Sequence, residues 1–144
     1  MTERHAPMTS RHHRMLLRAA VALGGVVPVT AGLTGLLFGL DMLPASEAPP
    51  MLRAVALDSH YRYLSGLLLG IGLGFWSTLS RIEEQGPRFR LLTAIVVLGG
   101  LGRLLGLAVQ GAPPGAMLFG LGMELVVTPL LCLWQWSVAR MERD

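Results

Sequence analysis

Four apolar segments dominate the chain, and each is long enough to form a helix that crosses a membrane. These segments are residues 19–40, 63–80, 91–110 and 116–138. The first two contain no charged residue, the third contains only Arg103 and the fourth contains only Glu124. A membrane-spanning helix needs about 20 predominantly apolar residues. Since 52% of the 144 residues are apolar and only 15% are charged, the chain also lacks the polar shell of a soluble domain. The sequence therefore predicts an integral membrane protein.

The expected fold is all-α, a transmembrane four-helix bundle formed by one domain at residues 19–138. Its spans are expected at about 19–40, 61–80, 90–110 and 116–137. A basic tail, residues 1–18, precedes this domain, and a short tail, residues 139–144, follows it. The first segment is interpreted as a membrane anchor, because its uncharged run exceeds the ~7 to 15 apolar residues of a cleaved signal peptide.

The distribution of arginines indicates how these spans are oriented. With four spans, the N-terminal tail, the loop after the second span and the C-terminal tail share one side of the membrane. That side holds nine Arg residues and the opposite side only Arg53. The nine are Arg4, Arg11, Arg14, Arg18, Arg81, Arg88, Arg90, Arg140 and Arg143. Because cytoplasmic loops carry an excess of basic residues, both termini are expected in the cytoplasm, and the chain is expected to be a multi-pass membrane protein.

Arg103 and Glu124 are the strongest candidates for a functional site. They lie equally far in sequence from Pro113 and Pro114, so two antiparallel helices joined at these prolines bring both charges to the same depth. That depth is about 11 Å below the helix ends, at about 1.5 Å per residue. Each charge would cost about 2.5 to 3.5 kcal/mol if it faced lipid. We therefore expect the two side chains to face each other.

A second polar cluster lies at the outer end of the second span, where Asp58, His60 and Arg62 occur together. The spacing of Asp58 and Arg62 is that of a helical ion pair, and Asp58 or Ser59 can also cap the helix. His60 is a candidate for proton transfer. If Arg62 joins Arg103, the cluster forms a pocket for an anionic or polar-headed ligand. The alternative is a structural role that holds the helices in register, and the sequence leaves both interpretations open.

Several further patterns have a structural interpretation. Small residues at four-residue spacing predict close helix packing, and they are Gly35 and Gly39, Gly66, Gly70 and Gly74, and Gly102 and Gly106. Pro28 and Pro129 predict kinks within spans. Glu83 and Glu84 are expected to be solvated in the loop after the second span.

No motif for catalysis, metal binding or a cofactor is recognised. His5, His12 and His13 lack companion Cys or acidic ligands, so no metal and no cofactor is predicted. The arginines bracket the apolar segments and form no single stripe, which excludes nucleic acid as an expected partner. The expected partners are the lipid bilayer and, beyond it, a second copy of the chain or a membrane partner protein.

A set of motifs resembles a known family. The motifs are Asp58-Ser59-His60-Tyr61-Arg62-Tyr63-Leu64-Ser65-Gly66, Gly99-Gly100-Leu101-Gly102-Arg103-Leu104-Leu105, the turn from Gly111 to Pro114, and Glu124-Leu125. Their order and spacing resemble the bacterial domain of unknown function 4345 family, over roughly residues 20–138. The resemblance implies a small multi-pass protein of the bacterial inner membrane with four spans. It also marks Asp58, Arg62, Arg103 and Glu124 as characteristic positions. It implies no activity.

Three functions remain compatible with these observations. The first, which is not enzymatic, is binding of a polar or anionic ligand, a lipid headgroup or a partner protein at the Arg and Glu cluster. The second is proton-coupled transport of a small molecule with Glu124 as the coupling carboxylate, although a carboxylate permanently paired with an Arg suits that mechanism poorly. The third is a quinone-linked membrane enzyme subunit, with His60 and Tyr63 exchanging protons.

Overall fold

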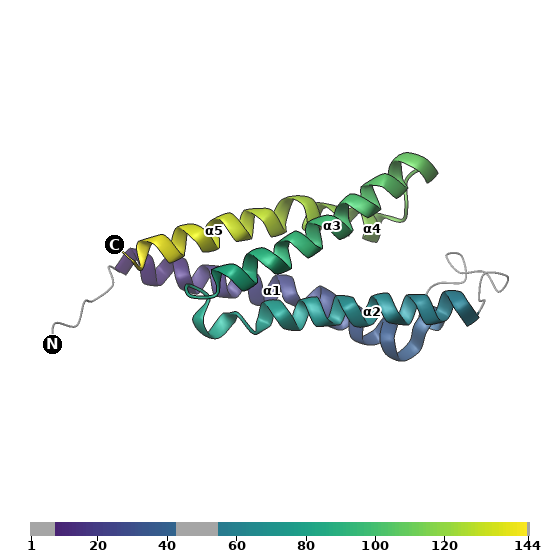
Figure 1. Ribbon diagram of the computed structural model, residues 1–144, viewed down its shortest axis with the longest axis horizontal. Helices are drawn as coiled ribbons and strands as arrows, with labels where there is room; N and C mark the ends of the chain where they lie inside the picture. Colours follow the sequence, from purple (N-terminus) through teal and green to yellow (C-terminus); the bar gives the residue numbers. More distant parts are fainter. Residues whose placement is uncertain (1–7, 43–54, 144) are drawn as a thin grey trace. The chain divides into compact units, whose positions relative to one another are not determined.

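The computed structural model describes residues 8–42 and 55–143, and within these ranges every regular element is a helix (Figure 1). The elements are α1 (Met8–Phe38), η1 (Gly39–Met42), α2 (Val55–Trp76), η3 (Leu79–Arg81), α3 (Gly86–Gln110), α4 (Gly115–Gly122), η4 (Met123–Val127) and α5 (Thr128–Met141). η1 and η3 are short 3-10 helices, whereas η4 is a π-helix between α4 and α5. The all-α prediction is confirmed.

Four helical stretches are long and apolar enough to cross a membrane. They are Arg11–Asp41, Val55–Arg81, Gly86–Gln110 and Gly115–Met141. Large apolar side chains stay exposed along them, and on α3 the exposed fractions reach 72% for Val109 and 68% for Leu98. Exposed apolar surface that continues along whole helices is expected where lipid, not water, is the solvent. The four candidate spans therefore indicate a multi-pass membrane protein.

Two helices begin earlier than the apolar segments. α1 already starts at Met8, so Arg11, Arg14 and Arg18 belong to the helix. α2 starts at Val55, which places Asp58 in its first turn. The alternative that Asp58 or Ser59 caps this helix is therefore wrong, and the Asp58 carboxylate is free to bond elsewhere.

The chain divides into two compact units, which we describe separately. The α1–α2 unit comprises residues 22–77, with most of α1, η1 and α2. The α3–α5 unit comprises residues 1–21 and 78–144, with the beginning of α1, then η3, α3, α4, η4 and α5.

Small residues bring the two helices of the α1–α2 unit into close contact. A Cβ atom at Gly32 would lie 2.5 Å from the backbone nitrogen of Leu69 and 2.8 Å from the backbone oxygen of Ser65. Gly25 makes room for the indole of Trp76, whose Nε1 donates a hydrogen bond to the carbonyl of Ala22 at 3.1 Å. Only glycine permits this approach of the backbones.

The glycines predicted to pack include positions where the structure describes no tight contact. A Cβ atom at Gly70, Gly102 or Gly106 would meet no atom of the described residues within 4 Å. On α2 the close approach instead involves Gly72, where a Cβ atom would lie 2.7 Å from Cγ2 of Val29. The four-residue spacing thus correctly predicted close packing between α1 and α2 through glycines. On α2, however, the tight contact occurs at Gly72 and not at Gly70.

The α3–α5 unit has a small core near the ends of its helices. Leu17, Ile82, Phe89 and Val138 are fully buried there. Gln135, which is 1% exposed, donates from its Nε2 to the carbonyl of Ile82 at 2.8 Å. This buried bond satisfies a backbone acceptor just after η3 and fixes α5 against the chain that enters α3.

Candidate functional site

Arg103 and Glu124 form a two-bond ion pair, so the expectation that these two charges meet is matched by the geometry. Arg103 extends from α3, and its Nε and Nη2 donate to Oε2 and Oε1 of Glu124, both at 3.1 Å. The Arg103 side chain is 36% exposed and that of Glu124 20%. A bidentate arrangement matches the planar guanidinium to the carboxylate and fixes the orientation of both groups.

The acidic partner lies in η4, the π-helix that interrupts the fourth candidate span. Pro129 follows this element and cannot donate a backbone hydrogen bond to the preceding turn. The carbonyl of Met123 accepts two hydrogen bonds from Thr128, one from its backbone N–H and one from its Oγ1 at 2.8 Å. Single π turns inside α-helices are often found at functional sites. The sequence predicted a kink at Pro129 but not this change of helix type.

Gly100 allows η4 to approach α3 closely. A Cβ atom there would lie 2.7 Å from Cδ2 of Leu125 and 2.9 Å from Cβ of Glu124. Any larger residue would push the π-helix away from α3. Gly100 therefore belongs to the site, although the sequence analysis placed it only within a glycine-rich motif.

Arg103 retains hydrogen-bonding capacity beyond its bonds to Glu124. A guanidinium has five N–H donors, and only the Nε and Nη2 donors described above bond to another described residue. The surroundings also leave room, because a Cβ atom at Gly99 or Gly106 would meet no described atom within 4 Å. The pair thus keeps N–H donors that no described residue uses, on a helix face where small residues leave the guanidinium uncrowded.

Asp58 and Arg62 form the second pair, and their partners are backbone groups of the helix end opposite. Nε of Arg62 donates to Oδ2 of Asp58 at 2.7 Å. Nη1 of Arg62 donates to the carbonyls of Leu36 at 2.9 Å and Leu37 at 2.7 Å, and Oδ1 of Asp58 accepts from the backbone N–H of Leu40 at 2.8 Å. These bonds satisfy carbonyls that the end of α1 leaves without helical partners. We call this arrangement the α1 clasp.

Gly39 is the backbone feature that makes the α1 clasp possible. Its φ of +60° ends α1 in a left-handed conformation that glycine adopts without strain. A side chain at this position would also collide with the Asp58 carboxylate and the Arg62 guanidinium. The sequence analysis grouped Gly39 with the packing glycines and missed this role.

His60 takes no part in the α1 clasp. Its ring is exposed and lies 6.2 Å from the ring of Tyr63, in a tilted arrangement. The five site residues predicted from sequence thus fall into two pairs and one separate histidine. The pairs belong to different compact units, Asp58 and Arg62 to one and Arg103 and Glu124 to the other.

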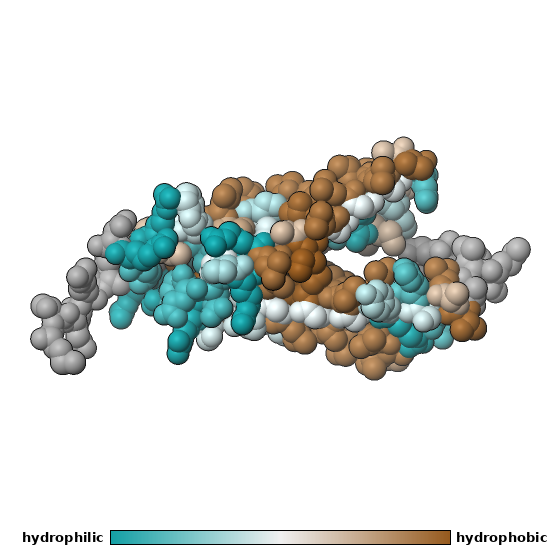
Figure 2. Space-filling view, in the orientation of Figure 1, coloured by the Kyte–Doolittle hydropathy of each residue, from teal (hydrophilic) through white to brown (hydrophobic). Residues whose placement is uncertain are grey.

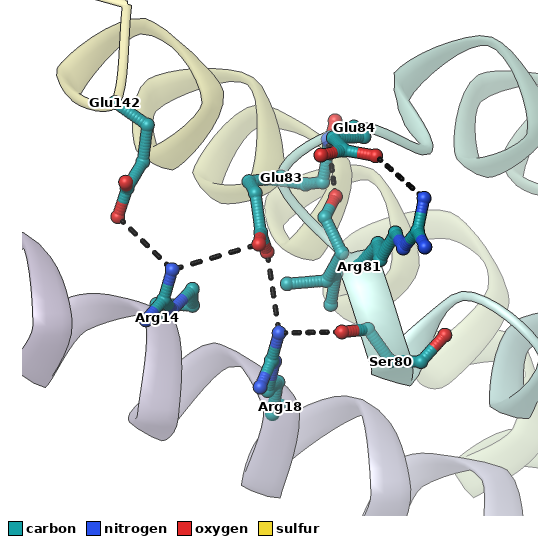
Figure 3. A network of polar contacts seen from close by, with 9 residues as sticks. Arg14, Arg18, Ser80, Arg81, Glu83, Glu84 and Glu142 are labelled. Atoms are coloured by element: carbon teal, nitrogen blue, oxygen red, sulfur yellow. Dashed lines mark hydrogen bonds and ion pairs between the residues drawn. The ribbon is translucent and has the colours of Figure 1, made fainter. Parts of the chain in front are cut away.

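A third polar cluster, which the sequence analysis missed, ties together three segments of the α3–α5 unit (Figure 3). Arg14 lies 3.5 Å from both Glu83 and Glu142, and Arg18 lies 3.4 Å from Glu83. Nη2 of Arg18 also donates to the carbonyl of Ser80 at 2.8 Å. We call these residues the Arg14–Arg18 network.

The expectation that Glu83 is solvated is wrong. Its side chain is only 17% exposed and pairs with two arginines of α1, whereas Glu84 is 62% exposed and lies 3.7 Å from Arg81. The signal was present in the sequence, because Arg14 and Arg18 are four residues apart and fall on one face once the helix includes them. Assigning both residues to a tail concealed it.

The described residues contain no cluster of three or more His, Cys, Asp or Glu side chains that could hold a metal ion. His12 and His13 are exposed on α1, and His5 lies outside the described residues. The chemistry that the site offers is therefore recognition of charge and of hydrogen-bond acceptors by guanidinium groups.

Comparison with known proteins identifies the family and goes no further. No curated protein and no solved structure shows significant similarity to the chain. The sequence matches the family described as a domain of unknown function (DUF4345) over residues 16–135, a range that includes Asp58, Arg62, Arg103 and Glu124. Because this match covers most of the 144 residues, the chain belongs to the DUF4345 family.

Proposed function

We propose that this membrane protein binds an anionic or polar-headed ligand at Arg103, and that Glu124 holds the guanidinium ready for it. The observation that carries the proposal is the bidentate pair itself, which leaves N–H donors of Arg103 unused by the described residues within two candidate spans. In hydrocarbon an unsatisfied N–H group is costly, so a ligand acceptor that bonds to these donors gains more than it would in water.

The pairing of Arg103 with Glu124 also favours binding over the two alternative functions, transport and enzymatic chemistry. A coupling carboxylate has to be open to a proton pathway, whereas both carboxylate oxygens of Glu124 already accept hydrogen bonds from Arg103. A quinone-linked enzyme subunit relies on His60 and Tyr63, which belong to the other compact unit. Binding needs neither a proton pathway nor a redox group.

The proposed ligand site faces the periplasm. The support is the Arg count of the sequence, which favours both termini in the cytoplasm of a bacterial cell and the turn between α3 and α4 on the outer side of the inner membrane. Whether the ligand is a free anion, a lipid headgroup or an acidic group of a membrane partner protein or second copy of the chain, the shared chemistry is an oxygen acceptor that carries negative charge.

Two substitutions test the proposal. Full-length protein is extracted in mild detergent, and intact-protein mass spectrometry measures the anionic molecules that remain bound. Arg103→Gln removes the positive charge and the guanidinium and is expected to lower retention at least about tenfold, since a charge-assisted hydrogen bond contributes about 1.5 to 3 kcal/mol. Glu124→Gln weakens the pair that orients the guanidinium and is expected to lower retention by a smaller factor.

Leu104→Ala is the matched control, because this exposed apolar neighbour on α3 changes neither charge nor donors. Its retention is expected to equal that of the unmodified chain. If Arg103→Gln and Glu124→Gln both behave like this control, the pair serves only to hold its helices together and the proposal is wrong.

A further inference from the structure

The end of the α3–α5 unit that contains the Arg14–Arg18 network carries a large excess of positive charge. Its described residues include eight Arg and three Glu. The arginines are Arg11, Arg14, Arg18, Arg81, Arg88, Arg90, Arg140 and Arg143, and the acids are Glu83, Glu84 and Glu142. In Figure 2 polar side chains gather over this end, whereas apolar side chains cover the middle of α3 and α5. We call it the arginine end.

The three acidic residues are already used within the unit. Glu83 and Glu142 are 17% and 20% exposed and pair with Arg14, and Glu84 pairs with Arg81. Their charges are therefore compensated internally. The arginines of this end therefore outnumber its acids.

Three of the remaining arginines lie on α3, on α5 and just after α5. Arg90, Arg140 and Arg143 are exposed and form no ion pair with a described residue, and Nε of Arg143 donates to the carbonyl of Ala139 at 3.1 Å. A Cβ atom at Gly86 would lie 3.9 Å from Nη1 of Arg90 and 3.6 Å from Oε1 of Gln135, so Arg90 on α3 lies near the part of α5 that leads to Arg140. The guanidinium of Arg140 stacks 3.5 Å above the ring of Trp136.

Tryptophan and arginine at the end of an apolar helix are the residues that the membrane interface favours, because the ring lies at headgroup depth and the cation reaches phosphate. The Trp136 ring holds the Arg140 guanidinium in place by a cation–π contact. A phosphodiester accepts hydrogen bonds in the fork geometry that a guanidinium presents.

We propose that the arginine end binds the headgroups of anionic phospholipids selectively, through Arg90, Arg140 and Arg143. The ligand is a lipid, because these positively charged arginines lie at the boundary between the apolar helix surface and the polar end, where the negatively charged phosphates of lipid headgroups are found. This site involves neither Arg103 nor Glu124, so it stands or falls independently of the ligand site proposed above.

Electron paramagnetic resonance of spin-labelled lipids tests the proposal. The full-length protein is placed in phosphatidylcholine vesicles, and the ratio of its association constants for spin-labelled phosphatidylglycerol and phosphatidylcholine is measured. At low ionic strength the ratio is expected to be well above one, and it is expected to fall towards one in high salt because exposed charges are screened. Inorganic phosphate is expected to act no more strongly than chloride at equal ionic strength.

The triple variant Arg90→Gln, Arg140→Gln and Arg143→Gln is expected to lose this preference. Each neutralised side chain lowers the ratio by up to about fivefold at low ionic strength. The triple Lys variant at the same positions keeps the charge and is expected to retain most of the preference, and Leu133→Ala on α5 is expected to leave it unchanged.

Two results would overturn the proposal: a ratio near one in the unmodified protein, or a ratio that the triple Gln variant leaves intact. A preference that high salt fails to weaken would overturn it as well. The salt series needs only the unmodified protein, so it decides the question even if a variant fails to fold.

Discussion

The α1 clasp and the pair of Arg103 with Glu124 are both ion pairs of an arginine with a carboxylate in candidate spans, yet they use the guanidinium differently. In the α1 clasp, Arg62 divides its donors between Asp58 and the last carbonyls of α1. In the other pair, Nε and Nη2 of Arg103 both donate to Glu124, and Arg103 bonds to no other described residue. Backbone partners make the first arginine part of the fold, whereas spare donors make the second available for binding.

The largest effect is expected from removing both members of the α1 clasp. Asp58→Leu with Arg62→Leu leaves the carbonyls of Leu36 and Leu37 and the N–H of Leu40 without their partners. Because orphaned backbone groups are costly, we expect the Tm in detergent to fall by roughly 5 °C or more. An unchanged Tm in circular dichroism would show that the clasp does not support the fold.

Removing both members of the other pair sharpens the comparison. Arg103→Leu with Glu124→Leu strands no charge and no backbone group, and replacing an ion pair by apolar residues is often neutral or stabilising. The Tm is expected to stay within about 2 °C, while retention of bound anions falls at least about tenfold in mass spectrometry. A Tm loss equal to that of the clasp variant would make both pairs structural.

Gly100→Ala addresses the approach of η4 to α3. The added methyl group collides with Leu125 and with Cβ of Glu124, so the helices separate and the hydrogen bonds of the pair lengthen. We expect about 1 to 3 kcal/mol of destabilisation by thermal unfolding, with a partial loss of anion retention. Gly102→Ala, where a Cβ atom meets no described atom within 4 Å, is the control. Equal behaviour of the two variants would contradict this view of the contact.

The smallest effect is expected at Thr128. Thr128→Val keeps the shape of the side chain but removes the bond from its hydroxyl to the carbonyl of Met123. The expected cost in thermal unfolding is about 0.5 to 1.5 kcal/mol. Ser137→Ala removes a similar bond from an exposed serine to Leu133 and is expected to cost less, because water replaces the lost partner there. A larger cost at Ser137 would argue against a special role of the π-helix.

The sequence predicted the elements that depend on local composition and spacing. The apolar segments predicted four helices, and the equal distances of Arg103 and Glu124 from the proline turn predicted that they meet. The spacing of Asp58 and Arg62 predicted their ion pair, but the backbone partners in the α1 clasp were not predicted, because they depend on the left-handed Gly39 and on carbonyls that every residue possesses. The partners of Glu83 were missed because the apolar segment begins only after Arg18, whereas the helix already begins at Met8.

The π-helix alters the angular phase of the fourth span. Glu124 and Gln135 are 11 positions apart, close to three full turns of an α-helix, so an uninterrupted α-helix would present both on one face. The wider turn of η4 absorbs about one extra residue, and each residue corresponds to about 100° of rotation. One continuous helix can thereby aim Glu124 at α3 while Gln135 stays locked under Ile82. The span therefore behaves as two helical halves that are rotated relative to each other about the helix axis. A face assigned by 3.6-residue spacing in one half does not continue as the same face in the other half.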